Sequence, residues 1–142
     1  MALPFDFEKL VQQAGDAIIA ANTDGSIVLW NKAAERTFGY AEDEALGKSL
    51  DLIIPERFRQ RHWDGYREVM RTGETRYGTR VLRVPAAHKD GRALSIAFTV
   101  TLIRSQNDTV QAIVAIVRDE TERWQEERAL RQKIAELEKQ QK

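Results

Sequence analysis

The sequence predicts an α+β domain built on one antiparallel sheet and followed by a charged helix. Two short β-rich segments flank the turn Thr23-Asp24-Gly25, three longer ones fill the second half of the chain, and helical patterns separate the two groups. The later strands are joined by short turns, Lys89-Asp90-Gly91 and residues 105–108, so we expect them to pair as a meander. Runs of strands separated by helices are typical of this fold class.

Each expected element has a local signal. Asn31 is a suitable N-cap for one helix, and Pro55 suits the first turn of the longest internal helix. The predicted helices cover residues 5–14, 32–38, 41–46 and 56–71. The predicted strands cover residues 16–22, 26–30, 77–87, 93–103 and 110–118.

The last part of the chain has a different character. Residues 120–142 contain no glycine or proline, and Leu130, Ile134 and Leu137 follow the 4-3 spacing of a coiled-coil seam. Such a helix cannot bury its apolar stripe alone. We therefore divide the chain into an N-terminal cap helix (1–15), a core domain (16–118) and a C-terminal dimerising helix (119–142).

Composition excludes several functions. Lys and Arg together number 22, as do Asp and Glu, and this balance argues against a nucleic-acid partner. No apolar run is long enough to span a membrane, and the first residues lack the pattern of a signal peptide, so we expect a cytoplasmic location. The chain has no cysteine, and no hydrolase or nucleotide-binding motif is present, so we do not expect an enzyme.

Short motifs across residues 5–121 together resemble a PAS domain. They are Asp24-Gly25-x-Ile27, Asn31-x-Ala33-Ala34, Phe38-Gly39-Tyr40, Glu44, Gly47, Pro55, Thr72-Gly73-Glu74, Lys89-Asp90-Gly91 and Val117-Arg118-Asp119-Glu120-Thr121. The resemblance implies a five-stranded antiparallel sheet flanked by short helices, with an amphipathic signalling helix after Asp119. It also implies a sensory, dimerising module that regulates an attached effector, such as a two-component histidine kinase or a cyclase.

Residues 55–62 also resemble the matching helix of haem-binding PAS gas sensors. His62 lies seven positions after Pro55 and eleven before Gly73, which are the spacings of the axial haem ligand in that subfamily. The resemblance therefore implies haem as cofactor, with His62 as the ligand of the metal. Arg76 matches a residue that holds a haem propionate, a role that suits a guanidinium group.

We expect the pocket for such a ligand between the long helix and the sheet. Three other residues of the helix recur at intervals of three and four with His62 and share its face: Phe58, Gly65 and Val69. The glycine is expected to leave space beside the imidazole. The remaining expected wall residues are Tyr77, Leu82, Phe98 and Val100. Leu82 stands where related oxygen sensors have an arginine, so the resemblance implies an apolar distal wall that favours carbon monoxide or nitric oxide over oxygen.

Other interpretations stay open. Trp30, Trp63 and Trp124 could stack on a flavin, although we interpret Trp30 as core and Trp63 as pocket rim. Many haem-free PAS domains carry a histidine in a similar run. The domain could thus be a cofactor-free relay that dimerises through its C-terminal helix, with the N-terminal helix as a further contact. We interpret His88 as solvated surface, because it precedes the turn Lys89-Asp90-Gly91.

Overall fold

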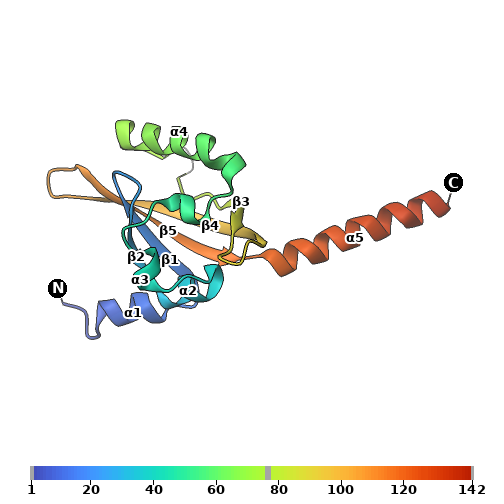
Figure 1. Ribbon diagram of the computed structural model, residues 1–142, viewed down its shortest axis with the longest axis horizontal. Helices are drawn as coiled ribbons and strands as arrows, with labels where there is room; N and C mark the ends of the chain where they lie inside the picture. The colour runs from blue at the N-terminus through green and yellow to red at the C-terminus, as the bar shows by residue number, and fades with distance from the viewer. Residues whose placement is uncertain (1, 76–77, 142) are drawn as a thin grey trace.

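The computed structural model describes residues 2–75 and 78–141 and is organised around one five-stranded antiparallel sheet (Figure 1). The strand order is β2-β1-β5-β4-β3, so the first hairpin joins the later meander through the pairing of β1 with β5. The strands are β1 (Ala17–Asn22), β2 (Ile27–Trp30), β3 (Leu82–Ala87), β4 (Ala93–Arg104) and β5 (Val110–Asp119). The predicted α+β class and the five-stranded sheet are confirmed.

The helices differ in how they lie relative to the sheet. They are α1 (Phe7–Gln13), α2 (Lys32–Phe38), α3 (Glu42–Ala45), the 3-10 helix η1 (Leu50–Ile53), α4 (Glu56–Thr72) and α5 (Thr121–Gln140). The helix α4 lies over one face of the sheet, whereas α5 projects away from the body of the molecule (Figure 1). Within residues 2–75 and 78–141, no helix has the length and apolar character needed to cross a bilayer.

The strand β3 is shorter than the sequence predicts. It begins at Leu82, which pairs with Phe98 of β4, whereas the expected strand begins at residue 77. Gly78 has a φ of +55° and lies in a turn, so the chain is still reversing direction just before the strand. Residues 78–81 are therefore not part of the strand, and they directly precede the β3 wall of the candidate site.

The polar centre of the core is the buried side chain of Asn31. Its Oδ1 accepts hydrogen bonds from the backbone N–H groups of Ile18 (2.9 Å) and Ala34 (3.0 Å). Its Nδ2 donates to the carbonyl oxygens of Val11 (2.8 Å) and Asp16 (3.1 Å). One side chain thus caps α2 as predicted and also ties α1 and β1 to it.

The apolar core lies beside this network. The largest fully buried apolar side chains are those of Trp30, Phe38 and Ile27. The indole Nε1 of Trp30 donates a hydrogen bond to the carbonyl oxygen of Tyr40 at 2.9 Å. Trp30 is therefore a core residue, as the sequence indicates, and its ring is not available to a flavin.

Candidate functional site

A cavity of about 160 Å³ lies between α4 and the face of the sheet that α4 covers. Alternate residues of β4 and β5 form its floor, because successive side chains of a strand point to opposite faces. Among these are Phe98 and Val100 on β4 and Ala115 and Val117 on β5. The described lining contains only two side chains with polar atoms, those of His62 and Tyr66 on α4.

The imidazole of His62 is the unsatisfied polar group of this wall. Its Nδ1 is buried and has no hydrogen-bond partner in the described part of the chain. Burial lowers the pKa of His62 below its usual value of 6.5, and the negative charge of Asp51 opposes this effect only in part. The ring is therefore neutral near pH 7. A buried polar atom without a partner costs about 1–3 kcal/mol, so a ligand that supplies a partner gains this energy on binding.

The hydroxyl of Tyr66 is already committed to the protein. It donates a 2.5 Å hydrogen bond to the carbonyl oxygen of Asn22, at the end of β1. Burial raises the pKa of Tyr66 to about 12, so the phenol keeps its proton at physiological pH. Tyr66 therefore anchors α4 to the sheet, and His62 remains the polar side chain of the lining that is free to contact a ligand.

Trp63 anchors α4 at a second point. Its Nε1 donates to the Oδ1 of Asp51 at 2.7 Å. Its ring covers Gly25 in the β1–β2 turn so closely that a Cβ atom there would lie 2.2 Å from the indole. Trp63 therefore sets the spacing between α4 and the hairpin, and it packs over this turn rather than forming a pocket rim as expected.

The cavity contains some of the predicted site residues and not others. His62, Phe98 and Val100 line it. Leu82 pairs with Phe98 and so shares its face of the sheet, but it lies beyond the cavity at the end of β3. Two further predicted positions, Arg76 and Tyr77, lie outside the described residues.

The sequence predicts the wrong face of α4 toward the sheet. Gly65 is exposed, and a Cβ atom there would meet nothing within 4 Å, so it does not open space beside the imidazole. Phe58 and Val69 are half-buried and stand outside the described lining. The buried face of the helix instead runs through His62 and Tyr66, which are one turn apart.

Sequence reasoning missed several wall residues: Tyr66, Ile19, Ala21, Ile53, Ile113 and Ala115. The alternation of Ile113, Ala115 and Val117 could have identified the floor, since period-two apolar patterns mark a buried strand face.

The other histidine is less exposed than the sequence indicates. The side chain of His88 is only 13% exposed and fits against Gly39, the C-cap of α2, where a Cβ atom would lie 2.5 Å from the ring. The Nδ1 of His88 accepts a hydrogen bond from the backbone N–H of Asp90 at 3.1 Å. His88 therefore joins the β3–β4 turn to α2, and its interpretation as solvated surface is wrong.

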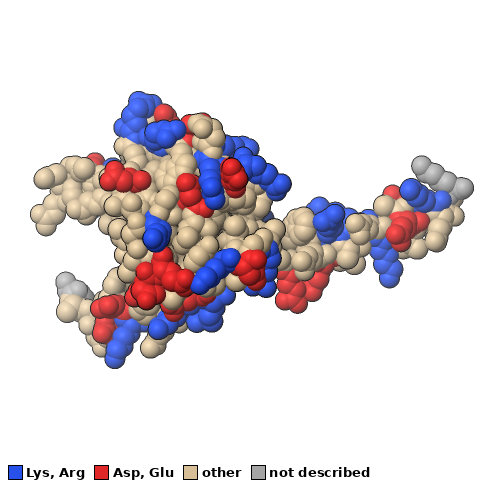
Figure 2. Space-filling view, in the orientation of Figure 1, with Lys and Arg blue, Asp and Glu red and all other residues tan. Residues whose placement is uncertain are grey.

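Basic side chains lie over α4 at the surface of the molecule (Figure 2). Arg67 and Arg71 pair with acids three residues earlier on the helix. Arg59 instead donates from its Nε to the carbonyl oxygen of Ile54 at 3.0 Å. Within residues 2–75 and 78–141 no charged side chain lines the cavity, so this arginine-rich segment provides no described anion site in it.

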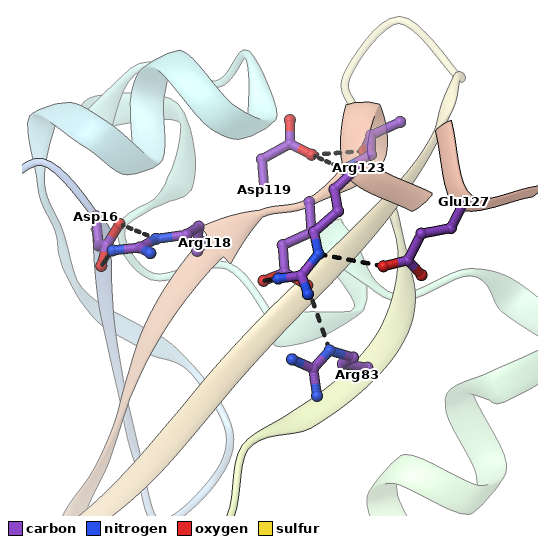
Figure 3. Close-up of polar contacts among 8 residues, drawn as sticks. Asp16, Arg83, Arg118, Asp119, Arg123 and Glu127 are labelled. Atoms are coloured by element: carbon purple, nitrogen blue, oxygen red, sulfur yellow. Dashed lines mark hydrogen bonds and ion pairs between the residues drawn. The ribbon is translucent and has the colours of Figure 1, made fainter. Parts of the chain in front are cut away.

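A second polar cluster lies where β5 continues into α5 (Figure 3). The Oγ1 of Thr121 accepts a hydrogen bond from the backbone N–H of Ser95 on β4 at 2.9 Å. The Glu120 side chain, 18% exposed, accepts from Arg83 of β3 at 3.3 Å and forms an ion pair with Arg123 of α5 at 3.7 Å. The first turn of α5 and the residue before it are thus tied to β4 and β3.

Comparison with known proteins identifies the family of this chain. The model of the PAS fold matches residues 6–119, so the chain belongs to the PAS family. The chain is 32% identical over 123 residues to the sensor protein FixL of Bradyrhizobium diazoefficiens, covering 86% of this chain and 24% of FixL. It is 25% identical over 128 residues to the oxygen sensor protein DosP of Escherichia coli, covering 90% of this chain and 16% of DosP.

Solved structures agree on the fold. A PAS domain from Colwellia psychrerythraea superimposes with a TM-score of 0.71 at 23% identity, over 81% of this chain and 94% of that domain. The resemblance that the sequence indicates is therefore confirmed. The chain spans less than a quarter of the length of FixL and of DosP, so it corresponds to a single module of these proteins.

Proposed function

We propose that this chain is the sensory domain of a signalling protein, that a ligand in the cavity contacts His62, and that α5 transmits the resulting change to an attached effector. The observation that carries the proposal is the buried, unpartnered Nδ1 of His62 in the wall of an otherwise apolar cavity. Polar atoms buried in native proteins are nearly always paired, so an unpaired one in a cavity wall is a candidate for contact with a bound ligand.

Haem, with gas sensing as its purpose, is the ligand that the relatives favour. DosP is an oxygen sensor by name, and a neutral imidazole such as that of His62 is a usual ligand of haem iron. The imidazole of His62 is therefore a suitable ligand for the iron, but the cavity is too small for the porphyrin ring. Drug-sized ligands occupy pockets of about 300–1,000 Å³ and haem is among the larger ones, whereas this cavity measures about 160 Å³. Haem binding requires α4 to lie farther from the sheet than it does here.

An absorption spectrum tests this candidate. The purified chain is recorded before and after one equivalent of haemin, alongside His62→Ala and, as a matched control, His88→Gln. A haem sensor gives a sharp Soret band that shifts with dithionite and carbon monoxide, persists in His88→Gln and is lost in His62→Ala. The same broad band in all three proteins excludes His62 as an iron ligand.

Flavin is less favoured than haem as the ligand, because Trp30 is buried in the core and Trp63 packs on the hairpin turn, so neither ring can stack on a flavin.

Arg83 connects the wall of the cavity to the start of α5. This residue immediately precedes Val84, which lines the cavity from β3, and its side chain lies on the opposite face and contacts Glu120 (Figure 3). A ligand that displaces Val84 therefore also moves the group that holds the first turn of α5. This connection supports transmission from the cavity to the helix.

The partner of α5 is proposed to be a second copy of this chain. No residue of α5 is buried in the described structure, and Leu130, Ile134 and Leu137 are each more than half exposed. Charges of both signs are interspersed along the helix (Figure 2), as on the flanks of a coiled coil. Phe7 and Leu10 of α1 are exposed as well, and they offer a further apolar contact to the second copy.

A further inference from the structure

We infer that the cavity, in the arrangement described here, binds a neutral one-ring molecule that carries a hydroxyl group, with phenol as its simplest form. The inference deepens the proposed function, on which it rests for the role of His62, by naming a ligand class. It stands on the volume of the cavity, the chemistry of its walls and His62, the one uncommitted polar side chain among the described lining residues.

The volume selects a single ring. An apolar cavity of about 150 Å³ accepts benzene, and the cavity beneath α4 measures about 160 Å³. A two-ring or larger ligand requires the walls to move, and Tyr66 and Trp63 hold α4 in place through hydrogen bonds to Asn22 and Asp51. Val84 lines the cavity and is 40% exposed, so the β3 wall reaches the surface and provides a way in for the ligand.

The walls select a neutral molecule. Within the described residues, the lining is aliphatic and aromatic apart from His62 and Tyr66, and it holds no charged side chain. Transfer of an ionised carboxylate into such surroundings is strongly unfavourable without a partner of opposite charge. A benzoate-like anion is therefore excluded even though its ring has the right size.

The imidazole selects a hydroxyl group. A neutral imidazole has one nitrogen that donates and one that accepts. A hydroxyl can both donate and accept, so it suits His62 whichever nitrogen carries the proton. The Tyr66 hydroxyl does not compete for the ligand, because it already donates to the Asn22 carbonyl.

The test is a set of titrations of the ¹⁵N-labelled chain followed by two-dimensional NMR. The probes are phenol, toluene, benzoate and 2-naphthol, which vary the hydroxyl, the charge and the number of rings in turn. Phenol is expected to shift the resonances of β4 and β5 and to bind more tightly than the other three. His62→Leu is expected to weaken phenol about tenfold, the value of one net hydrogen bond, without weakening toluene.

Replacement of two alanines of β5 by leucine locates the site. Ala115→Leu fills the cavity and is expected to abolish binding of phenol and toluene. Ala112→Leu adds the same atoms to the opposite face of the strand and is expected to leave binding unchanged. Equal binding of phenol to both variants overturns the location of the site.

Other outcomes separate this inference from the proposed function. If phenol does not bind while haemin gives a Soret band that depends on His62, the one-ring ligand is wrong and the sensory role of His62 stands. If phenol binds equally to the wild type and His62→Leu, recognition by the imidazole is wrong, and so is the role proposed for His62. Tighter binding of 2-naphthol or benzoate than of phenol contradicts the size or charge selection.

Discussion

At the scale of single residues, the chain contrasts the fully buried side chain of Asn31 with the half-buried side chain of His62. Asn31 uses its amide in four hydrogen bonds and has no capacity left for a ligand. His62 lies half-buried on α4 with an Nδ1 that has no partner among the described residues. The first arrangement stabilises the fold, whereas the second lowers stability and lies in the wall of the cavity.

The ionisation of His62 should be visible in the pH dependence of stability. Its folded-state pKa lies below the unfolded value near 6.5, so between the two values the unfolded chain binds more protons than the folded one. Ionisation of His62 therefore does not affect the free energy of unfolding above pH 6.5. As the pH falls through this interval, the free energy of unfolding of the wild type decreases. Urea unfolding at pH 7.5 and 5.5 should show a smaller loss for His62→Leu than for the wild type.

His88→Gln is the control for this measurement, because His88 is the other histidine of the chain. Identical pH dependence in the wild type and His62→Leu would show that the imidazole of His62 ionises as freely in the folded chain as in the unfolded one. At pH 7.5 the leucine variant should be at least as stable as the wild type, because it removes an unpaired polar atom.

At the scale of elements, the contact of α4 with the β1–β2 hairpin is a close fit between one ring and one backbone turn. Gly25 has a φ of +84° and lies under the Trp63 indole. Gly47 has nearly the same backbone angle, +83°, but a Cβ atom there would meet nothing within 4 Å. The two glycines therefore separate the cost of the backbone angle from the cost of the contact.

Alanine substitution at these two positions should give different losses of stability. Gly47→Ala is expected to cost about 1 kcal/mol, the penalty of a left-handed backbone with a side chain. Gly25→Ala should cost about 1–3 kcal/mol more, because Trp63 must also move. Chemical denaturation of both variants measures the difference. Equal losses would mean that Trp63 yields without cost and that α4 is not held by this contact.

Much of the fold follows from local signals, but the orientation of α4 does not. Asp24-Gly25, Asn31 and Pro55 mark a turn, a cap and a helix start that the structure confirms. The face of α4 depends on which stripe the sheet accepts. Gly65 and Tyr66 are adjacent in sequence and only about 100° apart around the helix, so the spacing alone could not choose between them.

Contacts between distant segments were equally beyond local reasoning. His88 meets Gly39, and Trp63 meets Gly25, across loops whose courses are fixed only by the assembled sheet. Phe98 and Val100, two of the expected wall residues, lie on the same face of β4 because alternation along a strand is a local property. Which of the residues on that face border a cavity depends on the packing of α4, as the position of Leu82 shows.

At the scale of the whole molecule, the chain consists of a packed domain and one helix that projects from it (Figure 1), and residues 122–141 of that segment are exposed. If a second copy covers the stripe of α5, deletion of residues 122–142 should convert a dimer at micromolar concentration into a monomer. Light scattering coupled to gel filtration measures this change. A truncated chain that remains equally dimeric contradicts the role proposed for the helix and directs attention to α1.

A point substitution sharpens this test. Ile134→Glu places a charge in the seam and should raise the dimer dissociation constant roughly tenfold or more. Gln132→Glu introduces the same charge at the outward position of the heptad and serves as the control. Equal effects of the two substitutions would show that net charge, and not the seam, governs association.

The way in which α5 leaves the sheet has a mechanical consequence. Twenty residues of helix, Thr121–Gln140, extend about 30 Å at 1.5 Å per residue. A tilt of about 10° at its first turn then displaces the far end by about 5 Å, roughly one helical pitch. The contacts of Glu120 with β3 and of Thr121 with β4 hold the point about which the helix would tilt. If a second copy pairs with α5, a small movement of β3 at these contacts would change which side chains meet at the far end of the helix.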